Sequence, residues 1–335
     1  MEFSYCDAPV WPAFVKPQKD ELLSSWITRI AHSHLLKVHT FCNILWPKTQ
    51  IWNRDVDRID NKAIFNLIGT RTFTSSETVN NTLLSSYEGF LFEKHTNLTN
   101  QKWIMPLGIY HRTRLKFGLM ICPQCLKKDG ANPFYRKQWR LSLYVCCVAC
   151  KCMLAEKCPQ CLAPINFFRA ELGHKTKTPS KDLSITKCDI CQLDFTTFTT
   201  EKASPDVLAF QINNDKILRE GYCEYTSYSH LYFRMLHQLA VIISSKSPRS
   251  DLIRSEIGKG MGIDFTFSFT YSGTVFDSLD LKSRANIFLM ANWLLEDWPK
   301  RFHDFYKSTF HNSLLFQEIG VIPFWFKRYM GYESV

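Results

Sequence analysis

The chain has 335 residues, of which 45% are hydrophobic and 21% charged, so it can bury the core of two or three ordinary domains. Only 13 residues are glycine, which excludes collagen-like and glycine-rich low-complexity structure. The formal net charge of +10 suits contact with a polyanion such as DNA or RNA, and it suits simple solubility equally well.

The sequence predicts a cytoplasmic protein. The most apolar runs, such as residues 239–243, fall far short of the roughly 20 residues that cross a bilayer. Residues 1–17 contain no basic stretch followed by an apolar one, so we expect no secretory signal. In the reducing cytosol, 13 cysteines favour metal binding over a disulfide framework.

The first predicted elements are two short helices. Residues 20–35 have the apolar spacing of an amphipathic helix, with Asp20 and Glu21 near its start, where carboxylates suit the helix dipole. Its apolar stripe comprises Leu22, Leu23, Trp26, Ile27, Ile30 and Ala31. A second helix is expected over Thr40–Leu45, ending before Pro47. Such a pair is compatible with a helix-turn-helix and with any two packed helices.

Cysteines concentrate in the middle of the chain, where ten of the thirteen lie between Cys122 and Cys191. Eight of these form four Cys-x-x-Cys pairs, namely Cys122/Cys125, Cys147/Cys150, Cys158/Cys161 and Cys188/Cys191. A two-residue spacing lets both sulfurs of a pair face one ion from a tight turn, and two pairs complete a tetrahedral four-thiolate site.

Four pairs in sequential order predict two structural Zn²⁺ ions, the first held by the two earlier pairs and the second by the two later ones. An iron–sulfur cluster is the main rival, and redox disulfides come third. A site with four thiolates has no open position for water, so it is structural and not catalytic. Cys146 and Cys152 flank the second pair, and a register in which Cys152 replaces a ligand stays open.

Basic residues among aromatic ones suggest contacts to nucleic acid. Two clusters lie before and within the cysteine-rich region, and lysines lie in the loop between the last two pairs; a solvated face or buried arginine pairs would give the same pattern. The candidates are Arg112, Arg114, Lys116, Arg136, Lys137, Arg140, Lys175 and Lys177.

The last part of the chain is predicted to be helical. Apolar residues keep helical spacing over Leu231–Ile243 and over Ile287–Trp298, where Pro299 follows. Residues 262–275 alternate apolar and polar side chains, as in a strand or an aromatic loop. No pattern for a phosphate loop, a zinc deaminase or an HExxH protease is present, which favours a non-enzyme.

The predicted fold is therefore mainly α, with a central zinc-binding region of short strands. We place a helical, helix-turn-helix-like domain at residues 1–115, a double zinc-finger region at 116–200 and a C-terminal helical domain at 201–335.

Three segments resemble the TniQ family. GLMICPQCL (118–126), YRKQWRLSLYVC (135–146) and CPQCLAPI (158–165) resemble its zinc region. DELLSSWITRIA (20–31) resembles its opening helix, and SRANIFLMANWLLEDWPKRF (283–302) its C-terminal helices. The family usually has a histidine where this chain has Cys150, an equivalent zinc ligand that makes the site more anionic.

The resemblance implies a target-selection subunit of a transposon. Short members join an RNA-guided Cascade-type CRISPR effector to the AAA+ ATPase TnsC, which brings the transposase to the DNA. At 335 residues this chain resembles the short type, acting as a monomer or a homodimer. In that role guide pairing reads the sequence. The alternative is a larger-type, TnsD-like protein that binds a specific attachment site itself.

Overall fold

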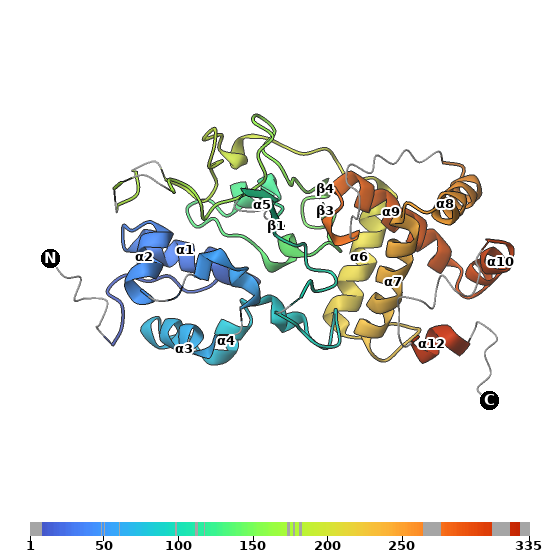
Figure 1. Cartoon of the computed structure of the whole chain (residues 1–335), viewed down its shortest axis with the longest axis horizontal. Coiled ribbons are helices and arrows are strands. Elements are labelled where there is room, and N and C mark those ends of the chain that lie inside the picture. The colour runs from blue at the N-terminus through green and yellow to red at the C-terminus, as the bar shows by residue number, and fades with distance from the viewer. Residues whose placement is uncertain are drawn as a thin grey trace.

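A computed structural model describes residues 9–47, 49, 51–59, 61–97, 99–110, 113–116, 118–172, 175–176, 178–180, 183–263, 276–309 and 322–328. Figure 1 shows the N-terminal helices at one end of the long axis and the C-terminal helices at the other. The cysteine-rich region lies between them, so the fold is mainly α with short strands in its centre, as the sequence predicts. Within these ranges, no helix has the length and apolarity needed to cross a bilayer.

The N-terminal end is built from α1 (Leu23–Ser33), α2 (Val38–Leu45), α3 (Lys62–Arg71) and α4 (Ser76–Asn80). Helix α1 is the centre of this group, because Trp26 and Ile27 are fully buried and Ile30 nearly so. The predicted second helix is present as α2 and ends where Trp46 and Pro47 follow.

The expected start of α1 is wrong by three residues, and the structure shows why. Asp20 has a left-handed backbone with φ of 61°, so the helix cannot begin there. Glu21 is fully buried and pairs with Arg29, whose Nη1 lies 2.6 Å from a carboxylate oxygen. Glu21 also accepts a hydrogen bond from the hydroxyl of Ser25 at 2.8 Å. The carboxylate thus anchors the chain before the helix instead of interacting with its dipole.

Helices α1 and α2 are joined by residues 34–37 and resemble a helix-turn-helix only in this arrangement. The second helix, VHTFCNIL, contains no lysine or arginine. Lys37, directly before it, is 6% exposed and lies 3.4 Å from a carboxylate oxygen of Glu171. The pair therefore presents no strong cation from α2 to a phosphate backbone, and a helix-turn-helix function stays a prediction.

The central region contains two antiparallel strand pairs, β1 (Gly108–Tyr110) with β2 (Thr113–Lys116) and β3 (Cys146–Cys147) with β4 (Cys152–Met153). Helix α5 (Pro123–Lys128) lies between the pairs in sequence. In β3 and β4, Cys147 faces Cys152 across the ladder, so the turn between the strands spans Val148 to Lys151.

The C-terminal end consists of α6 (Pro205–Glu220), α7 (Ser229–Ser244), α8 (Pro248–Met261), α9 (Leu281–Glu296), α10 (Lys300–Thr309) and α12 (Phe324–Lys327). Helices α7 and α9 confirm the two predicted apolar repeats. In Figure 1, α6, α7 and α9 run side by side next to the cysteine-rich region. The alternating segment 262–275 lies almost entirely outside the described residues.

A buried polar joint connects the C-terminal helices to the central region. Asp277 is 4% exposed and accepts hydrogen bonds from the hydroxyl of Ser142 at 2.5 Å and from the backbone N–H of Trp103 at 3.1 Å. His237 of α7 lies 2.9 Å from the other carboxylate oxygen. Because these groups come from three distant segments, the joint fixes how α7 sits against the centre of the molecule.

Candidate metal centres

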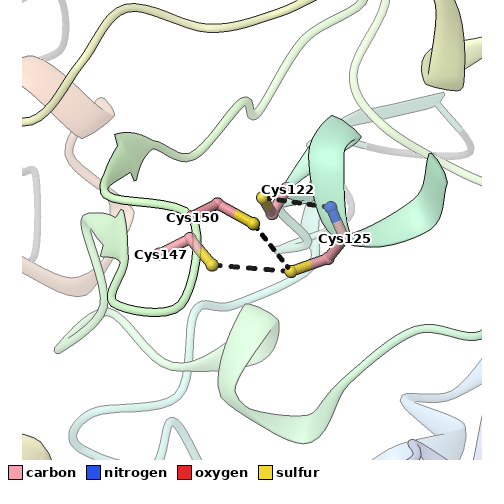
Figure 2. A group of neighbouring side chains, drawn as sticks. All are labelled: Cys122, Cys125, Cys147 and Cys150. Atoms are coloured by element: carbon pink, nitrogen blue, oxygen red, sulfur yellow. Dashed lines mark hydrogen bonds between the residues drawn. The ribbon is translucent and has the colours of Figure 1, made fainter. Parts of the chain in front are cut away.

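The first four-cysteine group forms where α5 meets the β3–β4 turn, as Figure 2 shows. Cys122 is the N-cap of α5, and its sulfur accepts a hydrogen bond from the backbone N–H of Cys125 at 3.4 Å. Cys147 ends β3, and Cys150 lies in the following turn. The Sγ of Cys125 lies 3.5 Å from that of Cys147 and 3.6 Å from that of Cys150. All four sulfurs lie within 4.8 Å of one another.

The second group brings together Cys158, Cys161, Cys188 and Cys191. The Sγ atoms of Cys158 and Cys191 are 3.5 Å apart, and those of Cys161 and Cys188 are 3.6 Å apart. Cys158 and Cys188 are 0% and 1% exposed, so the inner half of the group is enclosed by protein.

Three of the four pairs form the same kind of local turn. The residue after the second cysteine has a left-handed backbone, with φ of 54° at Lys151, 60° at Leu162 and 62° at Gln192. Its N–H donates to the carbonyl of the first cysteine, at 2.7, 2.9 and 3.0 Å respectively. The turn folds the chain back so that both sulfurs of a pair point the same way. The remaining pair, at the start of α5, reaches the same result through a helix N-terminus.

The geometry fits one tetrahedral ion in each group. A metal–sulfur bond of about 2.3 Å in a tetrahedron places sulfurs about 3.8 Å apart. The shortest sulfur–sulfur distances within the two groups, 3.5–3.6 Å, are close to that edge length. An iron–sulfur cluster places several metal atoms between its cysteine ligands. Here the four sulfurs of each group lie within 4.8 Å of one another, which leaves room for a single ion.

The pKa values of the cysteines shift in opposite directions, and hydrogen bonds with Cys122 and Cys125 lower the pKa of Cys147. Hydrogen bonding with Cys125 and Cys147 raises the pKa of the Cys122 thiol, and burial raises the pKa of Cys188 to about 12. A bound cation reverses this, because it stabilises thiolates and displaces their protons. Lys128 lies with its Nζ 3.5 Å from the sulfur of Cys150, which raises the pKa of that lysine and offsets part of the thiolate charge.

The two extra cysteines have different surroundings. Cys146 is 1% exposed and directs its sulfur towards the carbonyl of Val207 at 3.9 Å, so it faces the core rather than the metal group. Cys152 is also 1% exposed, and its sulfur lies 3.7 Å from that of Cys122. Sequence spacing alone did not reveal this contact, because it arises from the pairing of β3 with β4.

Two of the predicted nucleic-acid residues are buried inside the protein. Arg140 is 3% exposed and pairs with Asp55 and Asp57 at 2.7 and 3.1 Å. Lys137 is 6% exposed and donates from its Nζ to the hydroxyl of Ser86 at 2.8 Å. These two side chains are therefore engaged in internal contacts, and a nucleic-acid role for them stays a prediction that their burial does not support.

Arg136 is similarly engaged, although it is less buried. It makes two hydrogen bonds to Asp129, at 2.7 and 3.0 Å, and its guanidinium lies 4.2 Å from the ring centre of Phe134. A phosphate would have to compete with a bidentate carboxylate, and a nucleic-acid role for Arg136 stays a prediction.

The other predicted nucleic-acid residues are only partly described. Lys116, in β2, donates from its Nζ to the carbonyl of Ser278 at 2.6 Å, and burial lowers its pKa. Lys175 is exposed. Arg112, Lys177 and the side chain of Arg114 lie outside the described residues.

A known protein family matches the N-terminal and central parts of the chain. Residues 12–154 match the TniQ family. The TniQ match covers α1 to α5, the first four-cysteine group and both strand pairs, and it confirms the resemblance over that segment. TniQ proteins are targeting and adaptor proteins of transposition. No curated protein matches the chain.

Proposed function

We propose that this chain is a zinc-stabilised targeting adaptor. It links a target-recognition complex, a Cascade-type CRISPR effector with its guide RNA, to the AAA+ ATPase TnsC, and thereby recruits the transposase to target DNA. The observation that carries the proposal is a four-cysteine group, with metal-like sulfur spacing, inside the segment that matches TniQ.

In this proposal each group holds one Zn²⁺ through its four sulfurs. The ion supplies a cross-link between the turns, and such binding contributes on the order of 10 kcal/mol to the folding of small zinc domains. Cys122 and Cys125 are thereby tied to Cys147 and Cys150, which fixes α5 against the β3–β4 turn. With all four positions taken by sulfur, the centre provides a shaped surface and no site for substrate.

The TnsD-like alternative has weaker support. It draws on the net charge of +10 and on the α1–α2 arrangement. The lack of arginine or lysine in α2 and the internal use of Lys137 and Arg140 remove much of its basis. We therefore favour contacts to protein partners over direct reading of an attachment site.

Binding measurements with purified components test the proposal. The zinc-loaded chain should bind a Cascade–guide RNA complex and should bind TnsC, each on a biosensor surface. Cys147→Ala should weaken at least one of these interactions, whereas the adjacent Cys146→Ala, which faces the core, should not. A chain that contains zinc but binds neither partner refutes the adaptor role.

Gel shifts distinguish the adaptor role from the TnsD-like alternative. The adaptor should bind duplexes of attachment-site and scrambled sequence with the same weak affinity at physiological salt. Tight binding that depends on the sequence, in the absence of guide RNA, would instead support the TnsD-like function. Light scattering on the same samples distinguishes a monomer from a homodimer.

A further inference from the structure

An acidic, tyrosine-lined cavity lies at the C-terminal end of the molecule, away from the metal groups. It has a volume of about 720 Å³ and is formed by α6, residues 221–225, the first turn of α7 and the end of α9. This volume is within the range of about 300–1,000 Å³ that is usual for ligand sites.

The charged groups of the cavity are mainly carboxylates. Glu220, Glu224 and Glu296 line it, against a single lysine, Lys216. Glu296 pairs with Arg301 at 2.8 Å. Glu220 and Glu224 are exposed and make no ion pair with any residue that the structure describes. Both carboxylates therefore line one cavity of a chain whose net charge is +10, and Glu224 accepts a hydrogen bond from the hydroxyl of Tyr225.

The aromatic wall of the cavity, formed by Tyr225 and Tyr232, packs against helix α12. Tyr225 and Tyr232 both stack on Trp325 of α12, with ring centres 5.5 and 6.3 Å apart. One face of each tyrosine is thus covered, so a ligand meets the other face or the hydroxyl edge. Trp325 is itself 6% exposed, and its ring centre lies 5.3 Å from that of Trp298, so further aromatic rings pack behind the two tyrosines.

Tyr232 adds an independent sign of a ligand. It lines the cavity although the residue is only 3% exposed, and its hydroxyl makes no hydrogen bond with the described residues. The hydroxyl oxygen itself is not enclosed by protein, so it is open to the cavity. A ligand in the cavity can donate a hydrogen bond to it or accept one from it.

We propose that this cavity binds an arginine- or lysine-bearing peptide segment of a partner protein. Tyrosine faces and carboxylates together select a guanidinium or ammonium group, through cation–π contact and charge-assisted hydrogen bonds. The same carboxylates repel phosphate, so nucleic acid does not enter. The site is distinct from the metal centres, and its existence does not depend on the adaptor role.

Fluorescence anisotropy with a labelled tetra-arginine peptide tests the proposal, using the full zinc-loaded chain at physiological salt. The double variant Glu220→Gln/Glu224→Gln should weaken binding at least ten-fold. The matched variant Glu77→Gln/Glu201→Gln, which removes two exposed carboxylates elsewhere, should stay within two-fold of the parent. Tyr232→Phe keeps the ring and loses the hydroxyl, and it should weaken binding about three-fold.

Several results would overturn the inference. Equal affinity of the two glutamine variants would place the peptide elsewhere on the surface. No binding of tetra-arginine below 1 mM would remove the site. Free arginine amide that binds as tightly as the peptide would assign the cavity to a small cation instead. Thermal melts of each variant establish that a loss of binding is not a loss of fold.

Discussion

Arg140 offers the sharpest test of how this fold is held together. Its guanidinium makes two hydrogen bonds to Asp55, at 2.7 and 2.9 Å, and one to Asp57 at 3.1 Å. Asp57 is 3% exposed and also accepts from the backbone and the hydroxyl of Ser24. Burial raises the pKa of Asp57 to about 6, and the positive charge of Arg140 opposes that shift. Removing Arg140 therefore leaves two carboxylates without their counter-ion.

The expected cost follows from these distances. At about 3 Å and an effective dielectric constant near 20, each ion pair is worth about 5 kcal/mol before desolvation is subtracted. Breaking a buried pair by removing one partner typically costs about 3–5 kcal/mol. We expect Arg140→Met to fall in this range. Asp57 will protonate near neutral pH, because its pKa rises further when the arginine is gone, and this limits the loss.

Thermal unfolding in zinc-containing buffer measures the effect. Arg140→Met should lower Tm by roughly 5–10 °C, given a few degrees for each kcal/mol in a chain of this size. Arg219→Met is the matched control, because Arg219 is 74% exposed and lies 3.9 Å from Asp215, a pair worth at most about 1 kcal/mol. Adding Asp57→Asn to Arg140→Met should recover part of the loss.

The opposite pattern would refute the reasoning. If Arg140→Met melts like the parent chain but binds nucleic acid more weakly, Arg140 serves the surface role that the sequence suggested. The buried ion pairs would then contribute little to stability, and the internal role that the structure indicates for Arg140 would be wrong.

Three further predictions concern the metal groups, a buried carboxylate and a turn. Elemental analysis should find two zinc ions per parent chain, about one in Cys147→Ala and two in Cys146→Ala; equal contents in both variants would contradict the assigned ligands. Burial raises the pKa of Glu21 to about 6 from 4.5, so its contribution to stability is present below pH 4.5 and lost as pH rises through 6. Urea unfolding should therefore show the parent losing about 2 kcal/mol relative to Glu21→Gln between pH 4.5 and 7, and parallel pH profiles would rule this out. Gly118 and Gly130 have φ of 57° and 58°, but a Cβ on Gly118 alone would lie 2.4 Å from a backbone oxygen. Gly118→Ala should cost about 1–3 kcal/mol more than Gly130→Ala, and equal melting temperatures would show that the turn relaxes freely.

Much of the candidate site could be predicted from sequence, because its information is local. A Cys-x-x-Cys pair requires only a tight turn, and three such turns recur with the same left-handed residue after the second cysteine. Helices α7 and α9 were predictable for a similar reason, since a repeat of apolar residues at helical spacing needs one buried face and nothing else.

Sequence reasoning alone was therefore enough to group the eight cysteines into two sets of four and to locate the long helices α7 and α9. Whether a given charged side chain faces solvent or a buried counter-ion depended on the tertiary structure. Arg140 meets Asp55 and Asp57 across 85 and 83 residues of chain. A local pattern of basic and aromatic residues looks the same whether the charge faces solvent or a distant carboxylate. Only packing chooses between them, because burying a cation is tolerable only where a counter-ion arrives with it.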